Sequence, residues 1–459
     1  MKARNILHVA HGFFPECGGG TETHVRSVME KQQEMGLSIS LLHGSFEPRE
    51  EACIETRQDL PWPTHVLHRS DSYSDYWDRA HAVDASRLFR GFLREQKPDL
   101  VHIHQWIRLS DDLCEIAWQE GIPSLLFLHD LYASCPACFR LRPDDSHCER
   151  LLDPANCSDC VPLRGHESPR EVALGISMYA DNMRNELRKA CRTLAATHAT
   201  ADLVTEGLGL DADLVGLLPL SRVARFEPGL ASTWQAPAPG EALRLAFWGL
   251  VTRRKGVDVL LEGLRQLSES RPIEGRIELH VFGGIDTPEL SRELHDLARG
   301  LPVHFHGRYE YDQIATLRPH LAVFPSTCFE TYGLVLDEAI ELGAPSLVTS
   351  IGALPERVGN AGFAVPPKDP MALCNLLARV LDDPDLLTQA QAQIVPISPD
   401  PERHHELLMS EYERAIQACA AGRADLPQGP DLEQRLELET LRRSTATSRA
   451  PLQRGLTRN

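Results

Sequence analysis

The sequence HLAVFPSTCFETYGLVLDEAIELGAPSLVT, residues 320–349, decides the fold. It begins with one short apolar run, His320 to Phe324, and ends with another, Pro345 to Thr349. Between them, Leu334 to Leu342 carries apolar residues at helical spacing, so the stretch predicts a strand, a helix and a second strand. This alternation is typical of a parallel sheet covered by helices, which predicts a doubly wound α/β domain.

The same alternation continues on both sides of this stretch. In the same half of the chain it predicts elements at Leu243 to Trp248, Val257 to Leu267, Ile277 to Phe282 and Glu289 to Leu297. In the first half it predicts elements at Ile6 to Ala10, His24 to Gln33, Leu37 to His43, Leu100 to His104, Ser110 to Glu120 and Pro123 to Leu128. We therefore predict two doubly wound α/β domains whose strand ends face a cleft, where such sheets bind ligands.

The domain boundary is predicted near Glu227 to Gly240, because this passage has the proline and glycine content of a linker. The periodicity stops after Leu128 and resumes in a helix predicted at Glu171 to Leu194, with an irregular, cysteine-rich insertion at 131–170 between them. The predicted organisation is a first domain at 1–225, a second at 226–395, a helix at 396–421 and a polar, partly disordered tail at 422–459.

Length and charge limit the function. A chain of 459 residues exceeds what one hydrophobic core usually organises. The formal net charge of −18 repels nucleic acid, so we expect no nucleic-acid partner. There is no apolar run long enough to span a bilayer, and the first residues, MKARNILHVAHG, lack a signal-peptide core. We therefore expect a cytoplasmic protein.

Two glycine- or cation-rich motifs lie where predicted strands end. Gly18, Gly19 and Gly20 precede a helix, and their backbone could approach an anion closely; the alternative is a flexible turn. Arg253, Arg254 and Lys255 follow the strand Leu243 to Trp248 and could bind a diphosphate. The alternative for these cations is a solvated surface run.

Two further motifs carry acids and a histidine. Glu330 lies in the loop before the helix predicted from near Gly333, and Glu338 lies within that helix. An acid at this place can accept hydrogen bonds from sugar hydroxyls; the alternative is a helix cap and a surface glutamate. His129 and Asp130 follow the strand Pro123 to Leu128, where a histidine can contact a sugar or transfer a proton.

Five stretches, taken in their order along the chain, resemble the retaining glycosyltransferases of family four. They are FFP–CGGGTETHV, LVHIH, HD, KGVDVLLEG and PSTCFETYGLVLDEAIELGAPSLVTSIGALPERVGNAGFAV. The resemblance covers about residues 5–385 and is most specific from 320 to 365. It implies the GT-B architecture of two Rossmann-like domains. It also implies transfer of a sugar from a nucleotide-sugar donor with retained anomeric configuration and without a catalytic metal.

The resemblance also implies roles for individual residues. Glu330 would hold hydroxyls of the donor sugar, Glu338 the ribose hydroxyls, and Lys255 would neutralise the diphosphate. The loop Gly18 to Gly20 would line the reaction centre, and His129 would contact the donor sugar. Backbone amides near the sugar or the phosphate would come from Tyr332, Gly333 and Leu334.

The chain departs from the family pattern at two positions. Leu250 stands where the family often has an arginine that binds the diphosphate, so Arg253 or Arg254 is predicted to replace it. Ala353 stands where the family has the second glycine of a turn, which leaves the conformation of that loop open.

The insertion contains five cysteines, Cys135, Cys138, Cys148, Cys157 and Cys160. Two CxxC pairs at this separation predict a metal site, either a structural zinc or an iron–sulfur cluster; the alternative is a group of reduced thiols. A tetrahedral zinc needs only four ligands, and His147 could replace one cysteine. A subset of the resembled family favours as ligands Cys135, Cys148, Cys157 and Cys160.

We expect a metal-independent glycosyltransferase that moves a sugar from a UDP-, GDP- or ADP-sugar to a glycan or lipid-linked acceptor in cell-envelope or exopolysaccharide synthesis. A sugar-nucleotide epimerase and a non-catalytic sugar-nucleotide-binding protein are the alternatives. The sequence also shows a basic stripe on the helix after the insertion, formed by Arg184, Arg188, Lys189 and Arg192. This stripe predicts either peripheral contact with the inner surface of a membrane or a solvated helix face.

Overall fold

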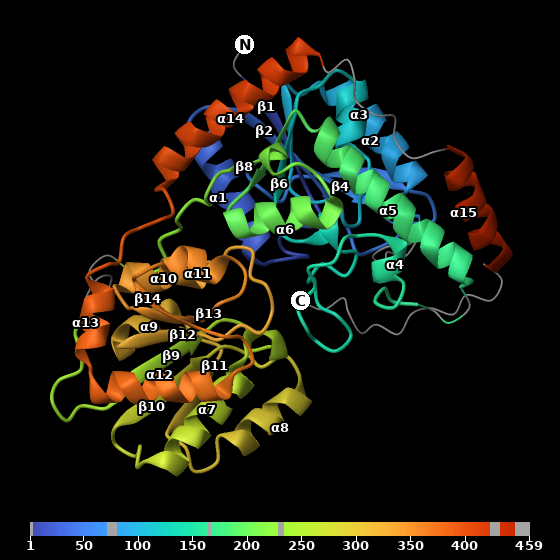
Figure 1. Cartoon of the computed structure of the whole chain (residues 1–459). Coiled ribbons are helices and arrows are strands. Elements are labelled where there is room, and N and C mark those ends of the chain that lie inside the picture. The colour runs from blue at the N-terminus through green and yellow to red at the C-terminus, as the bar shows by residue number, and fades with distance from the viewer. Residues whose placement is uncertain are drawn as a thin grey trace. The chain divides into compact units, whose positions relative to one another are not determined.

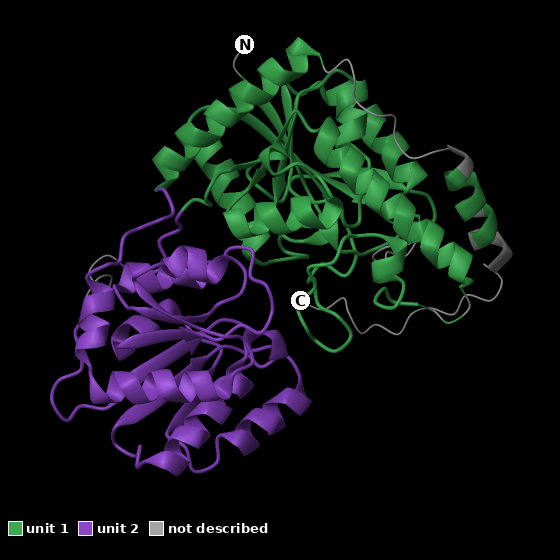
Figure 2. Cartoon of the chain, viewed as in Figure 1, with its two compact units in different colours: residues 1–221, 400–459 green, residues 222–399 purple. Residues whose placement is uncertain are grey.

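The computed structural model describes residues 3–70, 80–163, 165, 167–227, 234–422 and 432–445. The chain forms two compact units (Figure 2). Unit 1 comprises residues 1–221 and 400–459, and unit 2 comprises residues 222–399. Each unit is a sheet with helices packed on it (Figure 1), which confirms the prediction of two doubly wound α/β domains.

Unit 1 contains an eight-stranded sheet in the order β3-β4-β2-β1-β5-β6-β7-β8. Its strands are β1 Asn5–Ala10, β2 Ser38–Gly44, β3 Cys53–Arg57, β4 Thr64–His68, β5 Leu100–Ile103, β6 Ser124–Leu128, β7 Arg192–Ala195 and β8 Val215–Leu217. All neighbours pair in parallel except β3 and β4, which are antiparallel. The chain order therefore reverses at β1, and β1 and β5 are neighbours at this switch point.

The helices of unit 1 come from both ends of the chain (Figure 1). They are α1 Gly20–Glu34, α2 Val83–Gln96, α3 Leu113–Gln119, α4 Pro154–Cys157, α5 Pro169–Lys189, α6 His198–Leu208, α14 Pro401–Ala421 and α15 Leu432–Thr445, with 3₁₀ turns η1 Tyr132–Ser134 and η2 Ala212–Leu214. Helix α14 packs on α1, β6 and β7, so the helix expected at 396–421 is part of the first folding unit. Helix α15 packs on α5, where Leu438 is buried against Leu174 and Met178.

Several helices begin with the same local signal. Helices α4, α5 and α14, together with α8 Pro288–Leu297 and α12 Pro370–Asp382 of unit 2, each have an aspartate, serine or threonine at the N-cap and a proline in the first turn. The cap side chain accepts a hydrogen bond from a first-turn N–H, and proline loses nothing there because its missing N–H would be unbonded. This signal fixes helix starts from the sequence alone.

Unit 2 contains a six-stranded parallel sheet in the order β11-β10-β9-β12-β13-β14. Its strands are β9 Leu243–Trp248, β10 Ile277–Phe282, β11 Val303–Gly307, β12 Leu321–Phe324, β13 Ser346–Thr349 and β14 Gly362–Val365. Its helices are α7 Val257–Ser270, α8 Pro288–Leu297, α9 Tyr311–Leu317, α10 Val335–Leu342, α11 Ala353–Val358, α12 Pro370–Asp382 and α13 Asp385–Gln391, with the 3₁₀ turn η3 Arg253–Lys255.

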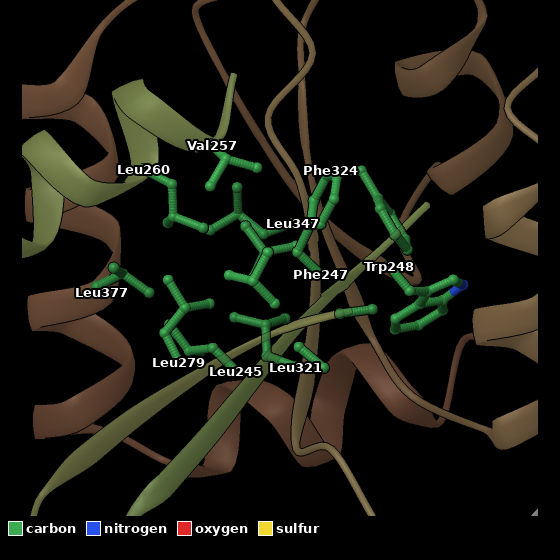
Figure 3. Packing of buried hydrophobic residues seen from close by; sticks show 14 of the residues in the cluster. Leu245, Phe247, Trp248, Val257, Leu260, Leu279, Leu321, Phe324, Leu347 and Leu377 are labelled. Carbon is green, nitrogen blue, oxygen red and sulfur yellow. The ribbon is translucent and has the colours of Figure 1, made fainter. Parts of the chain in front are cut away.

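The core of unit 2 lies between this sheet and its helices (Figure 3). Leu245 and Phe247 of β9 and Leu321 of β12 pack with Leu260 of α7 and Leu377 of α12, and all are buried. Strands buried on both faces need continuous apolar runs, and the apolar residues of β9 and β12 supply them. The core therefore fixes the strands whose ends carry the loops with Lys255 and Glu330.

Several boundaries differ from the sequence-based expectation. The helix predicted at Glu171 to Leu194 is α5, which ends at Lys189 because Ala190 leaves the helical conformation and Arg192–Ala195 joins the sheet as β7. The tail from residue 422, which was predicted to be polar and partly disordered, contains helix α15. The buried Leu438 of this helix packs on α5. The other residues of the tail, 423–431 and 446–459, and part of the predicted linker, 228–233, lie outside the described residues.

The basic stripe predicted on α5 is not an exposed face. Lys189 is buried and its ammonium lies 3.7 Å from the centre of the Trp118 ring. Arg192 pairs with Glu411 of α14 at 2.6 Å, and Arg184 donates to the carbonyl of Leu208. These side chains contribute to packing inside unit 1 and give no support to a lipid-binding stripe. Among the described helices, none combines the length and apolar character needed to cross a membrane.

Candidate active site

Two loops of unit 2 bring a lysine and a glutamate together. Lys255 ends η3, which follows β9, and Glu330 lies in the loop that follows β12, the neighbouring strand. The Lys255 Nζ atom lies 2.6 Å from Glu330 Oε1, and the Ser326 hydroxyl donates to the same oxygen at 2.9 Å. Because the carboxyl ends of neighbouring parallel strands meet at one edge of the sheet, residues separated by 75 positions become direct partners.

Two glycines allow these loops to approach each other. A Cβ atom on Gly256, which has φ of 69°, would lie 2.0 Å from the carbonyl oxygen of Pro325. A Cβ atom on Gly352, which has φ of 67°, would lie 2.6 Å from the carbonyl oxygen of Glu330. Ala353 begins α11 and donates its N–H to the Glu330 carbonyl at 2.8 Å, so the alanine that departs from the family turn is accommodated. Only glycine fits at positions 256 and 352 without displacing the loop.

The lysine and glutamate keep each other charged. Burial by itself would raise the pKa of Glu330, but the Lys255 ammonium and the Ser326 hydroxyl outweigh it, and the pKa is lowered. Burial would likewise lower the pKa of Lys255, yet the Glu330 carboxylate raises it. Both side chains remain partly exposed to solvent. The pair therefore offers a cation and an anion to a ligand at the end of β9 and β12.

Backbone amides lie next to this pair. Gly333 and Leu334 precede α10, and within the described part of the chain their N–H groups donate to no other protein group. The opposite side of the loop is held by Arg357, whose guanidinium donates to the Gly333 carbonyl at 2.8 Å and lies over the Tyr332 ring. Because the carbonyls are turned toward Arg357, the N–H groups and the positive end of α10 stay available for an anion.

Arg357 itself is part of a buried network. Its Nη2 atom lies 2.6 Å from Asp337 Oδ1, and the two side chains are 2% and 6% exposed. The Ser398 hydroxyl donates to the same Asp337 oxygen, and it also lies 2.5 Å from the Tyr332 hydroxyl. This network ties the loop before α10 to the segment that ends unit 2.

Glu338 has side-chain partners of its own. The Trp248 Nε1–H donates to Glu338 Oε2 at 2.7 Å, and the Tyr311 hydroxyl donates to Oε1 at 3.0 Å. Burial raises the pKa of Glu338, although both hydrogen bonds and Arg225 oppose this rise. Trp248 and Tyr311 hold the Glu338 carboxylate in one orientation. Its remaining lone pairs could accept hydrogen bonds from ribose hydroxyls.

The two arginines beside Lys255 differ. Arg253 makes a two-point contact with Glu293 of α8, at 3.0 and 2.6 Å, and lies 3.5 Å from Asp258. The charge of Arg254 acts on the pKa of both Glu330 and Lys255. Of the two predicted replacements for the missing arginine, Arg254 is therefore the one whose charge reaches the lysine–glutamate pair.

The glycine-rich loop of unit 1 precedes α1. Within the described residues, the N–H groups of Gly18, Gly19 and Gly20 donate to no protein group. A Cβ atom on Gly18 would lie 2.7 Å from the Phe14 ring, so glycine is required there. Glu22 in the first turn is 3.0 Å from His11; burial opposes ionisation, but His11 lowers the pKa of Glu22 to about 2. The loop thus combines unbonded amides with a fixed carboxylate.

His129 follows β6 and begins a hydrogen-bonded chain of histidines. Its Nε2 lies 2.9 Å from His104 Nδ1, and His104 Nε2 lies 3.1 Å from His8 Nδ1. His8 Nε2 contacts the side-chain oxygen of Gln32, whose amide donates to the hydroxyl of Tyr412 on α14. Burial lowers the pKa of His129 to about 3, so the imidazole is neutral at pH 7.

The cysteines of the insertion gather around one cavity. Its wall includes Cys135, Cys148, Cys157 and Cys160. Burial, with added contributions from neighbouring thiols, raises the pKa of Cys157 to about 11. The buried Arg140 guanidinium donates to the carbonyls of Ser134 and Arg150, and the Cys148 N–H donates to the Arg140 carbonyl. Arg140 therefore holds together segments that carry the cysteines.

Sequence reasoning found the strand-end residues but missed their supports. Arg357 lies within the PERVG segment of the sequence, and its contacts with Asp337 and the loop before α10 follow only from the fold. Nothing local in the sequence marks Ser398 or Tyr412, because each acts through contacts far along the chain.

Comparison with known families gives matches in both units. The family described as Glycosyltransferase Family 4 matches residues 18–220, and Glycosyl transferases group 1 matches residues 242–383. A D-inositol 3-phosphate glycosyltransferase of Streptomyces scabiei is 33% identical over 304 residues, which cover 63% of this chain and 61% of the relative. One from Corynebacterium urealyticum is 23% identical over 383 residues, covering 80% and 83%. The chain spans about three fifths of the length of the Streptomyces scabiei relative.

Solved structures of other proteins share the fold. Anabaena HepE in complex with UDP and glucose has a TM-score of 0.55 at 16% identity, covering 89% of this chain and 99% of HepE. Sucrose-phosphate synthase of Thermosynechococcus elongatus has a TM-score of 0.56 at 16% identity, covering 97% and 100%. With family matches in each unit, two parallel-sheet domains and these neighbours, the chain belongs to the group 1, family 4 glycosyltransferases of the GT-B fold.

Proposed function

We propose that the chain is a retaining glycosyltransferase that takes a sugar from a nucleotide-sugar donor bound by unit 2. The observation that carries this proposal is the contact of Lys255 with Glu330 beside Ser326, next to the unbonded amides of Gly333 and Leu334. A nucleotide sugar has both features that this arrangement can bind, a diphosphate and a set of hydroxyls. Cations and amides suit the first, and a carboxylate suits the second.

The same groups suit the chemistry. When the bond between the sugar and the phosphate breaks, negative charge grows on the diphosphate and positive charge on the sugar. Lys255, Arg254 and the N-terminal end of α10 stabilise the growing negative charge, and Glu330 orients the sugar hydroxyls. No separate nucleophile is required, because the departing phosphate can take the proton of the acceptor hydroxyl. Glu338 is proposed to bind the ribose.

We propose that unit 1 contributes two groups to the reaction. The backbone amides of Gly18, Gly19 and Gly20 line the reaction centre, and the neutral imidazole of His129 contacts the donor sugar. A glycan or a lipid-linked saccharide of cell-envelope or exopolysaccharide synthesis is the proposed acceptor. The names of the relatives add D-inositol 3-phosphate to the acceptors that should be tested.

A donor screen tests the proposal. Thermal unfolding should be followed with UDP-, GDP- and ADP-sugars, and one nucleotide should raise the melting temperature because it binds only the folded protein. UDP-glucose is the first choice, since HepE binds UDP and glucose. Incubation of the stabilising donor with and without acceptors then separates the alternatives. A transferase needs the acceptor, an epimerase changes the sugar without it, and a binding protein changes nothing. No stabilisation by any donor would contradict the proposal.

We also propose that the insertion binds a structural zinc ion through Cys135, Cys148, Cys157 and Cys160. Thiolates are the ligands that a structural zinc takes, and these four cysteines line one cavity in a segment with little regular secondary structure. Zinc would supply folding free energy to this segment, and binding would release the thiol protons. We expect freshly purified protein to contain one zinc per chain by elemental analysis.

Serine variants provide the matched comparison for this zinc. Cys157→Ser should lose the metal, whereas Cys138→Ser should keep it, because Cys138 does not line the cavity. Iron and inorganic sulfide in stoichiometric amounts, in place of zinc, would instead indicate an iron–sulfur cluster. Protein without zinc or iron would contradict a metal at this place.

A further inference from the structure

A group of polar side chains lies on the edge of the unit 2 sheet, apart from the loops that carry Lys255 and Glu330. Glu278 and His280 belong to β10, and His304 and His306 belong to β11, which is the edge strand. His280 is paired in register with His304. Because alternate residues of a strand point to the same side, all four side chains lie on one face of two neighbouring strands.

Three of these residues have donor atoms at the spacing of a metal site. One atom each from Glu278, His280 and His304 lies within 4.8 Å of the other two. The His280 Nε2 atom is 3.6 Å from Glu278 Oε2, which is too long for a good hydrogen bond. Zinc bonds of about 2.0–2.2 Å place the ligand atoms of a tetrahedral site roughly 3.3 Å apart. The donor atoms are thus close enough for side-chain rotation to bring them onto one ion.

The two ring nitrogens of His280 have different surroundings. Its Nδ1 lies 3.0 Å from His306 Nε2, within hydrogen-bond distance. Its Nε2 is buried and has no hydrogen-bond partner. When Nδ1–H donates to His306, the Nε2 lone pair is left free on the side of Glu278. A metal-binding histidine is usually oriented by a second group, which accepts a hydrogen bond from the ring N–H that does not face the metal.

The group is also accessible from solvent. His304 is exposed, and the Glu278 side chain is 40% exposed, whereas His280 lies beneath them at 12%. A metal ion could enter from solvent and keep water in its remaining coordination positions. Two imidazoles and one carboxylate are ligands that suit divalent transition metals better than calcium or magnesium.

We propose that Glu278, His280 and His304 form a binding site for a divalent transition-metal ion, with His306 orienting His280. The ion would join the edge strand β11 to β10. It lies on a different set of residues from the proposed zinc cysteines and from the proposed donor site, so it does not depend on the glycosyltransferase proposal.

Calorimetric titration of the full chain with NiCl2 tests this site. We expect one class of Ni²⁺ binding to weaken at least tenfold in His304→Gln, and the exposed position of His304 keeps the fold intact. His306→Ala should weaken the same binding by a smaller factor, because the outer hydrogen bond is lost. His295→Gln is the matched control, since His295 is an exposed histidine on α8 outside the group, and Ni²⁺ affinity should stay within twofold.

Circular dichroism of each variant establishes that it is folded. Ni²⁺ binding that His304→Gln leaves unchanged would overturn the proposal, and so would the absence of any Ni²⁺ binding by the wild-type chain. A loss of the same size in His295→Gln would also overturn it, because the metal would then bind surface histidines without selection. None of these results depends on turnover of a nucleotide sugar.

Discussion

Replacing Glu330 with alanine should lower kcat/KM about 30- to 150-fold, equivalent to about 2 to 3 kcal/mol of transition-state stabilisation. Among the described residues, the Lys255 ammonium has one carboxylate partner, Glu330, whose Oε1 atom lies 2.6 Å from Nζ. Its loss removes the proposed contact with the sugar hydroxyls and frees the lysine to move. Initial rates with the donor identified by thermal shift, at varied donor concentration, measure this effect.

Glu293→Ala is the matched control for that experiment. Glu293 is also a glutamate of unit 2 that pairs with a cation next to Lys255, but its partner is Arg253 and it lies on α8. Its removal should change kcat/KM by less than about threefold, in line with the small effects of surface pairs. Near wild-type turnover in Glu330→Ala would refute the role of Glu330, and equal losses in both variants would show that general charge matters instead.

Replacing Arg357 with methionine should destabilise unit 2 by about 3 to 5 kcal/mol. The substitution leaves the Asp337 carboxylate buried without its cation, which had been 2.6 Å away, and it removes the donor to the Gly333 carbonyl. A buried charge without a partner costs far more than the pair itself contributes. Urea unfolding followed by tryptophan fluorescence measures the change, because Trp248 lies in the core of unit 2.

Arg271→Met provides the comparison at the surface. Arg271 contacts Asp382 at the same 2.6 Å, but the two side chains are 30% and 59% exposed. Solvent replaces the lost partner there, so the unfolding midpoint should hardly move. If Arg357→Met unfolded at the same urea concentration as Arg271→Met, the buried network would not be what holds the loop before α10.

The fold could be predicted because it follows from local patterns, whereas the central pair of the site was implied by the family resemblance. Apolar runs of strand length alternate with helical periodicity, and this fixed β9, β12 and α10. The family resemblance implied that Lys255 and Glu330 act on the same donor. The structure places β9 beside β12 and brings the two side chains into contact.

The supports of the site could not be predicted because they depend on distant contacts. Arg253 and Arg254 are adjacent in sequence, yet only the structure shows that Arg253 is engaged by Glu293 of α8. The return of α14 to unit 1 places Tyr412 beside Gln32, a separation of 380 positions that no periodic pattern encodes. Periodicity also failed at β7, because the apolar residues of a short strand directly after α5 continue the helical pattern.

Titration of UDP, GDP or ADP, chosen as the nucleotide of the donor that raises the melting temperature, into the wild-type chain and into Lys255→Ala tests the central claim most directly. Arg271→Ala is the control cation of the same unit. The claim is that the lysine at the end of β9 binds the diphosphate of the donor. Wild type should bind this nucleoside diphosphate, Lys255→Ala should bind it at least tenfold more weakly, and Arg271→Ala should match wild type. Equal affinity in all three proteins, with a folded Lys255→Ala variant, would contradict the claim.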